Sequence, residues 1–302
     1  MTLDFDPDRP PPPARPAATL ILLRDRRDPL RDPLRDDERD DKRDLEVAVM
    51  QRSLQSKFMG GAVVFPGGRV EPHDARGEWP AALTTHAGES SEPWWDDEGF
   101  AARVAACREA LEEVAMVPLT GGAITSEALE GLRRAIAEGV APFREALRAE
   151  GRALDLDALV PFSRWVTPEA EQRRFDARFF VARAPEGQEG AIDRREAIRT
   201  FFATPRALLD DYERGAIALF PPTHRTLVRL STVRSVDDAL SLARRASLDV
   251  ICPRFALDDG VPTLALPGDR LHAIAEPRIE GASRYVLRGD RWVEEDAPRA
   301  SI

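Results

Sequence analysis

The chain has 302 residues, a formal net charge of −10 and 43% hydrophobic residues, which is enough apolar content to bury a sizeable core. The negative charge argues against a nucleic-acid duplex as partner. No apolar run approaches the length of a membrane span, so we expect no membrane contact. Only two cysteines are present, Cys107 and Cys252, and the acidic start lacks the features of a secretory signal. Both observations predict a cytoplasmic protein.

The first part of the chain divides into a leader, two strands and a charged loop. Prolines dominate residues 1–16, which we expect to form a disordered leader. The apolar run at 17–24 and the run at 45–53 each predict a buried strand. Residues 24–44 carry eight basic and nine acidic side chains, so this low-complexity stretch predicts an exposed loop. A nucleic-acid site is the weaker alternative, because acids interleave the basic residues.

The chain as a whole predicts a mixture of α and β structure, with strands dominating the first half and helices the second. The stretch GAVVFPGG at 61–68 predicts a strand that ends in a glycine turn. Helices are expected over 99–116 and over 126–150, the second with an interruption near Gly139 and Pro142. The later predicted elements are strands at 159–168 and 173–183, helices beginning near 204, 221 and 235, and β segments at 263–269 and 283–293.

The helix predicted at 99–116 separates an acidic face from an apolar one. At 3.6 residues per turn, Glu109, Glu112 and Glu113 lie together on the face opposite the apolar side chains. Arg108 precedes Glu112 by one turn and can brace it. Such a face is either solvated or supplies hard oxygen ligands to Mg²⁺ or Mn²⁺. Taken alone, the helix favours the solvated, metal-free interpretation.

A glycine turn upstream, FPGGRVEPHD, favours the metal-site interpretation of this helix over the solvated one. Gly67 and Gly68 allow the backbone to turn sharply and to approach another group closely. The Nudix box consists of a strand, a glycine turn, an acid and a helix carrying Arg-Glu-x-x-Glu-Glu. The chain therefore resembles the Nudix hydrolases, with Gly68 at the box glycine, Asp74 at the first acid, and Arg108 opening the helical half.

Three departures from the usual box accompany the resemblance. Between Asp74 and Arg108 lie 33 residues, where the box normally has a short spacer, and we place this insertion at 75–99. Asp74 replaces a glutamate, a carboxylate on a longer stem. Ala115 replaces a glycine, so we expect the helix to take a different cap or to run on.

The insertion is also a clue to the branch of the family. A long insertion within the box is a feature of the peroxisomal coenzyme A diphosphatases of mammals and of their bacterial relatives. The chain resembles that branch outside the box as well. The similar segments are residues 55–68, 164–180, 219–230 and 266–270.

The resemblance implies an α/β/α sandwich with a mixed β-sheet, a long insertion inside the box, and extra C-terminal helices and β segments. It implies a hydrolase domain at 17–248 and a C-terminal extension, packed on that domain, at 249–302. The implied reaction is metal-dependent hydrolysis of a nucleoside diphosphate linked to another group. Coenzyme A or acyl-coenzyme A is the first choice of substrate, giving phosphopantetheine and adenosine 3′,5′-bisphosphate. The alternatives are ADP-ribose or NADH, or a regulator that binds a nucleotide without hydrolysing it.

The resemblance also implies roles for individual residues. Glu109, Glu112 and Glu113 become the candidate catalytic residues and ligands of Mg²⁺ or Mn²⁺, and Arg108 would orient them. The turn residues Gly67, Gly68 and Asp74 would support this arrangement. Glu196 is the candidate metal ligand from outside the box, with Glu189 as the second choice and a surface acid as the competing interpretation.

The substrate side of the site is less well defined. Arg173 or Arg174 could hold a substrate phosphate, because a guanidinium group matches phosphate oxygens. Adjacent strand residues point to opposite faces, so only one of them is expected to do so, and a surface ion pair is the competing interpretation. The tryptophans of the insertion either anchor it or stack on an adenine. The expected partner is one small nucleotide-type molecule, and a homodimer stays open.

Overall fold

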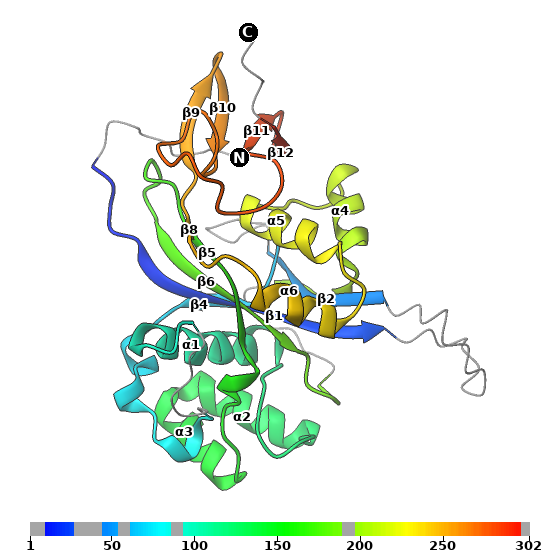
Figure 1. The fold of residues 1–302 in the computed structure, drawn as a ribbon. Helices are drawn as coiled ribbons and strands as arrows, with labels where there is room; N and C mark the ends of the chain where they lie inside the picture. The colour runs from blue at the N-terminus through cyan, green and yellow to red at the C-terminus, as the bar shows by residue number, and fades with distance from the viewer. Residues whose placement is uncertain (1–9, 27–43, 54–60, 86–92, 189–196, 297–302) are drawn as a thin grey trace, which may run out of the picture.

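A computed structural model describes residues 10–26, 44–53, 61–85, 93–188 and 197–296 (Figure 1). They form three layers, with helices on both faces of a mixed β-sheet, and a second, smaller sheet at one end. This architecture is the α/β/α sandwich that the resemblance to the Nudix hydrolases implies. In these residues, no helix combines the length and the apolar character needed to cross a bilayer.

The central sheet contains eight of the described strands. Six follow the order β3-β2-β1-β6-β5-β8, while β4 pairs with β1 and β7 pairs with β2. The β1–β6 and β5–β8 pairs are parallel and the others are antiparallel, so the sheet is mixed. The bounds are β1 Arg15–Arg26, β2 Asp44–Arg52, β3 Val63–Val64, β4 Gly67–Arg69, β5 Val160–Val166, β6 Phe175–Arg183, β7 Ala197–Ala203 and β8 Val250–Ile251.

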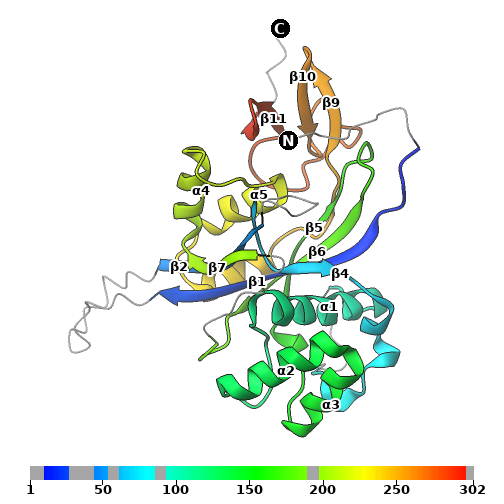
Figure 2. The same cartoon turned by 180° about the vertical axis from the view of Figure 1, so that it is seen from behind.

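Strand β1 is central because its side chains pack into two hydrophobic cores, one on each face of the sheet. Leu20 and Leu22 pack with α1, α2 and α3, whereas Ile21 and Leu23 pack with α4, α5 and α6 on the opposite face (Figures 1 and 2). A strand covered on both faces reads as a continuous apolar run, which is what the sequence shows here. The helices are α1 Asp97–Val114, α2 Ser126–Glu138, α3 Val140–Ala149, α4 Pro205–Glu213, α5 Pro221–Leu230 and α6 Val236–Arg244.

The helix boundaries follow local signals. Helix α1 begins after Asp96, whose carboxylate accepts a hydrogen bond from the backbone N–H of Gly99 at 2.8 Å. The predicted interruption between α2 and α3 falls at Gly139, which has φ of 133°. Both helices are therefore confirmed, with the break where the glycine allows it.

The described part of the insertion is packed against the body of the protein. Trp79 is buried and donates its indole N–H to the carbonyl oxygen of His73 at 3.0 Å. The fully buried Arg103 donates to the carbonyl of Trp94 at 2.6 Å and lies over the ring of Trp95. These contacts favour the anchoring interpretation of the tryptophans. The short 3₁₀ helices are η1 Pro72–Asp74, η2 Arg76–Glu78, η3 Ala81–Leu83 and, between α3 and β5, η4 Leu156–Ala158.

A four-stranded antiparallel sheet, the C-terminal sheet, closes one end of the sandwich beside α5 (Figure 1). The fully buried Arg225 of α5 holds it by donating to the carbonyls of Glu280 at 2.6 Å and Ala282 at 2.7 Å. The hydroxyl of Tyr212 donates to the carbonyl of Trp292 at 2.5 Å. The strands are β9 Arg254–Asp258, β10 Val261–Ala265, β11 Arg284–Arg288 and β12 Arg291–Glu295, in the order β12-β11-β10-β9.

Some element boundaries differ from the expected ones. Strand β1 begins at Arg15, inside the predicted leader, and runs to Arg26, inside the predicted charged loop. Residues 1–9 and 27–43 lie outside the described part of the chain. The C-terminal extension begins with β8, which joins the central sheet, so the extension completes the sandwich as well as packing on it.

Candidate active site

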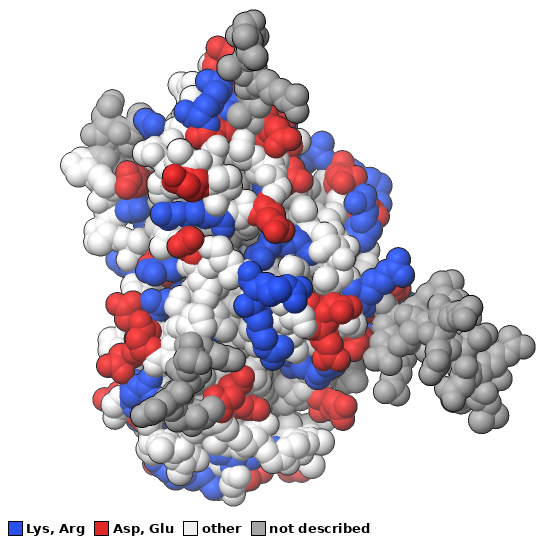
Figure 3. All heavy atoms as spheres, in the orientation of Figure 1, with Lys and Arg blue, Asp and Glu red and all other residues white. Residues whose placement is uncertain are grey.

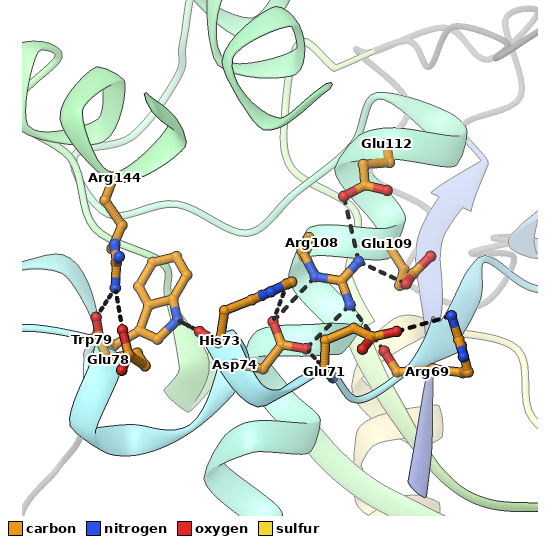
Figure 4. Close-up of polar contacts among 10 residues, drawn as sticks. All are labelled: Arg69, Glu71, His73, Asp74, Glu78, Trp79, Arg108, Glu109, Glu112 and Arg144. Carbon is orange, nitrogen blue, oxygen red and sulfur yellow. Dashed lines mark hydrogen bonds and ion pairs between the residues drawn. The ribbon is translucent and has the colours of Figure 1, made fainter. Parts of the chain in front are cut away.

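Arg108 joins the glycine turn to helix α1 (Figure 4). Its guanidinium binds Asp74 of η1 through two contacts, Nε to Oδ1 and Nη2 to Oδ2, each of 3.1 Å. Nη2 also donates to the carbonyl of Arg69 at 2.9 Å. Only 6% of the Arg108 side chain is exposed and none of Asp74. Asp74 and Arg108 are separated by 33 residues in the sequence, yet they form a buried, bidentate ion pair.

The same guanidinium reaches the acidic face of α1. Nη1 donates to Oε1 of Glu109 at 2.7 Å and to Oε1 of Glu112 at 3.4 Å. Burial lowers the pKa of Arg108, but hydrogen bonds and charges from Asp74 and Glu109 outweigh it and hold that pKa above its ordinary value. Burial raises the pKa of Glu112, Arg108 opposes that shift, and the like charge of Glu109 adds to it. Arg108 is thus a fixed cation that positions two carboxylates.

Close approach explains the two glycines of the turn. A Cβ on Gly68 would lie 2.4 Å from Cδ of Glu109, and a Cβ on Gly67 would lie 2.5 Å from the carbonyl oxygen of Ala18. The backbone N–H of Gly67 donates to Oε2 of Glu113 at 2.9 Å. Neither glycine has a positive φ, so space and not backbone conformation requires them.

A cavity of about 520 Å³ opens beside this turn. Glu109 and Glu113 both line it, because Gly67 and Gly68 carry no side chains that would block them. Glu112 is not among the described residues that line this cavity. The structure therefore divides the three predicted carboxylates, with two at the cavity and the third held against Arg108.

The donor set suits a hard divalent cation, although its present geometry does not form a ready-made site. In the described residues, no group of three or more His, Cys, Asp or Glu side chains is arranged to hold a metal ion. Carboxylate oxygens are nonetheless the ligands that Mg²⁺ and Mn²⁺ take in proteins. Glu109 and Glu113 reach the same Cβ-free turn, which leaves room for a ligand beside them. The carboxylates of Glu109 and Glu113 beside the cavity therefore fit the ligand chemistry of such an ion.

Comparisons with known proteins agree with this geometry. No family model matches the chain. The acyl-coenzyme A diphosphatase NUDT19 of Gallus gallus is 27% identical over 85% of this chain and 80% of that protein. Its Xenopus laevis counterpart is 26% identical over 82% and 77%. A solved NUDIX hydrolase from Alicyclobacillus acidocaldarius matches with a TM-score of 0.59 at 26% identity, over 76% of this chain and 96% of that one.

The chain is similar to the Nudix hydrolases in both sequence and fold. Its interrupted box is one structural unit, because the turn and the helix meet at Arg108. The described part of the insertion packs its tryptophans against the core on the α1 face, and Asp74 and Arg108 remain in contact.

The end of the Nudix helix corrects one expectation. We expected a different cap or a longer helix at Ala115, but this residue takes the left-handed conformation, with φ of 53° and ψ of 41°. Its N–H donates to the carbonyl oxygen of Leu111 at 3.1 Å, which is the bond that closes a helix at a left-handed glycine. The surrounding packing therefore keeps the glycine geometry although the residue is an alanine.

The two arginines proposed for phosphate have different surroundings. Arg174 donates to the carbonyl oxygens of Thr167 at 3.1 Å and Pro12 at 2.9 Å, which ties the chain before β1 to the β5–β6 turn. Arg173 is exposed and lines the cavity. The structure thus places Arg173, and not Arg174, where a substrate could reach it.

Two further arginines at the cavity were missed. Arg52, at the end of β2, and Arg69, directly after the box glycines, both line it. Arg69 also pairs with Glu71 at 3.1 Å (Figure 4). The position of Arg69 on the turn was an available signal, whereas Arg52 reaches the site only through the pairing of β2 with its neighbours.

The candidate acids outside the box, Glu196 and Glu189, lie outside the described residues. The described chain resumes at Ala197, which pairs with Arg52. Since Arg52 lines the cavity, the backbone beside Glu196 enters the sheet next to the candidate site. This neighbourhood keeps Glu196 as a candidate.

Proposed function

We propose that this chain hydrolyses the diphosphate of coenzyme A or acyl-coenzyme A with Mg²⁺ or Mn²⁺, releasing adenosine 3′,5′-bisphosphate and the phosphopantetheine half. One observation carries the proposal: Glu109 and Glu113 share a single cavity with three arginines and a long apolar wall. A diphosphate joined to a large organic group needs carboxylates to hold the metal ion, arginines to bind phosphate and an apolar wall for the organic group. The similarity to proteins named acyl-coenzyme A diphosphatase supports this substrate class.

The residues of the box divide the work. Glu109, Glu112 and Glu113 would hold the divalent ion, which when bound neutralises phosphoryl charge and lowers the pKa of water. Glu109 would act as ligand or general base. Arg108 fixes Glu109 and Glu112 in place, and Asp74 fixes Arg108, so that both act through the glutamates. Positioning of this kind accounts for much of the catalysis in phosphoryl transfer.

The arginines would bind the substrate's phosphates. Arg173 is the candidate for the 3′-phosphate of coenzyme A, since it is exposed and lines the cavity. Arg52 and Arg69 lie at the same cavity as the carboxylates and would contact the diphosphate. Glu196 would supply a further ligand from outside the box.

The proposed partner is a small molecule and not a duplex. On the face drawn in Figure 3, basic and acidic side chains are intermixed, unlike the continuous basic surface that a nucleic-acid duplex requires. Cys107 and Cys252 are both free thiols, which suits a reducing compartment and supports the cytoplasm as the site of action. A homodimer stays a prediction, which sedimentation measurements would test.

The test is turnover of coenzyme A, octanoyl-coenzyme A, ADP-ribose and NADH by the purified protein with Mg²⁺ or Mn²⁺. We expect the coenzyme A substrates to be cleaved, and Glu109→Gln and Glu112→Gln each to lower kcat by at least about 100-fold. The matched control is Glu145→Gln on α3, which is exposed and does not line the cavity. Its activity should stay at the wild-type level.

Three outcomes would overturn parts of the proposal. Cleavage of ADP-ribose or NADH alone would replace the substrate class. Calorimetric binding of an intact nucleotide without turnover would favour a regulator. Wild-type activity in both glutamine variants would place the chemistry elsewhere.

A further inference from the structure

The cavity continues away from the carboxylates as an apolar channel, lined by Trp165, Ala177, Phe220, Leu264 and Trp292. These residues come from β5, β6, the start of α5 and the C-terminal sheet. The channel and the carboxylates thus belong to one continuous space, although the carboxylates come from α1 and the channel is lined by residues that follow it in the chain. Whatever group is attached to a diphosphate at the glycine turn can extend into this channel.

Strand register gives the channel its direction. Arg69 pairs with Ala17, Ala17 with Ala177, and Ala177 with Trp165, across β4, β1, β6 and β5. Residues directly opposite one another point to the same face of a sheet. Three strand spacings separate Arg69 from Trp165, about 14 Å. Ala17 and Ala177, in the middle of this row, have small side chains. They leave the space between Arg69 and the indole of Trp165 open.

The C-terminal sheet forms the other wall. Leu264 and Trp292 belong to the core on this face, yet both line the channel. Arg225 and the bond from Tyr212 to Trp292 fix the sheet in this position. The C-terminal sheet therefore sets the width of the channel.

We propose that the apolar channel binds the pantetheine arm of the substrate and the acyl group attached to it, and that the C-terminal sheet is the element that selects for this group. This proposal rests on the proposed function. An alkyl chain matches an apolar wall, whereas a purine needs several hydrogen-bonding groups along its edge. The buried indole N–H of Trp165 has no hydrogen-bond partner in the described part of the chain. The amide carbonyls of pantetheine are acceptors that could satisfy it.

The experiment fills the channel and measures the binding of each product separately. Ala177→Leu adds apolar volume to the channel at a half-buried position. Calorimetry should show 4′-phosphopantetheine binding weakened by about tenfold or more, because the added side chain occupies its space. Adenosine 3′,5′-bisphosphate should bind within about twofold of wild type. The matched control is Ala216→Leu, which is exposed and away from the cavity.

A second variant enlarges the channel and reports through substrate preference. Phe220→Ala removes a half-buried ring that lines it. The ratio of kcat/KM for palmitoyl-coenzyme A to that for coenzyme A should rise by about fivefold, since a wider channel accommodates a longer chain. Thermal unfolding of both variants checks that they are folded.

The outcomes separate this inference from the proposed function. Weaker binding of adenosine 3′,5′-bisphosphate in Ala177→Leu, with or without an effect on 4′-phosphopantetheine, would overturn the inference and assign the channel to adenosine. An unchanged chain-length preference in Phe220→Ala would also overturn it. Failure of the proposed function would instead appear in the wild-type protein, as absence of coenzyme A cleavage.

Discussion

A buried arginine lies near each end of the cavity, and the two arginines bind different kinds of partner. Arg108, at the glycine turn, is surrounded by carboxylates, with Asp74 as its bidentate partner. Arg225, at the C-terminal sheet, donates to the neutral carbonyls of Glu280 and Ala282, and its contact with the carboxylate of Glu294, at 3.3 Å, is longer. The first arrangement places charges beside the proposed catalytic glutamates, whereas the second attaches one sheet to a helix.

The difference in partners separates two kinds of effect. Removing Arg108 leaves a buried charge and also releases the glutamates proposed to act in catalysis. Removing Arg225 leaves polar groups unpaired and loosens a wall of the cavity. Loss at the turn should therefore lower kcat as well as stability, whereas loss at the C-terminal sheet should lower stability and raise KM with little change in kcat.

The largest effect is expected from Arg108→Gln. Asp74, which is fully buried, would lose its cation, and the free energy of unfolding should fall by about 3–5 kcal/mol. We expect kcat to fall at least about 100-fold, because Glu109 and Glu112 would lose their common donor. Urea denaturation and steady-state kinetics measure the two effects.

The double variant Asp74→Asn with Arg108→Gln is the control. It removes the buried charge, so part of the lost stability should return, while kcat should stay low. Full recovery of kcat would show that Arg108 affects activity only through stability.

A pH titration tests the opposite end of the cavity, where His224 lies beside Arg225. Burial, followed by the charge of Arg225, lowers the pKa of His224 from 6.5 to about 4. The unfolded chain takes up a proton below pH 6.5 but the folded chain only near pH 4. Stability from this group is therefore complete above pH 6.5 and declines as the pH falls towards 4, by about 3 kcal/mol in total.

The His224→Gln variant isolates this contribution. Its free energy of unfolding should decline less than that of the wild type between pH 6.5 and 4 in urea titrations. Parallel curves for the two proteins would show that His224 protonates equally in both states. The bond between its Nδ1 and the Tyr285 hydroxyl, at 3.1 Å, would then not depend on a neutral ring.

Arg225→Met should have a smaller effect on stability, about 2 kcal/mol, because its lost partners are mostly backbone carbonyls. In the folded variant, KM for the coenzyme A substrate should rise and kcat should stay within about threefold of wild type. Steady-state kinetics below the unfolding temperature measure both. A fall in kcat like that of Arg108→Gln would remove the distinction between the two ends.

The two ends also differ in how far the sequence predicted them. The acidic face of α1 and the role of Gly68 follow from helical periodicity and from the short-range demand for space, so both were accessible. The wall formed by Leu264 and Trp292 was not, because no local pattern specifies which distant apolar surface covers a sheet. Arg52 was missed for the same reason.

At the turn end of the cavity, the conformation of Ala115 was not predicted from the sequence. Its substitution should have the smallest effect on the free energy of unfolding. Its left-handed conformation costs an alanine about 1 kcal/mol relative to glycine, but its methyl group is buried and contributes to packing. Ala115→Gly should therefore raise the free energy of unfolding by less than about 1 kcal/mol, as measured in urea. Ala110→Gly, on the same helix and also buried, should lower it by about 1 kcal/mol or more. Opposite signs for the two substitutions would show that backbone conformation, and not lost burial, decides the outcome at the helix end. Destabilisation by both would mean that the packed methyl group outweighs the strain on the helix that carries Arg108.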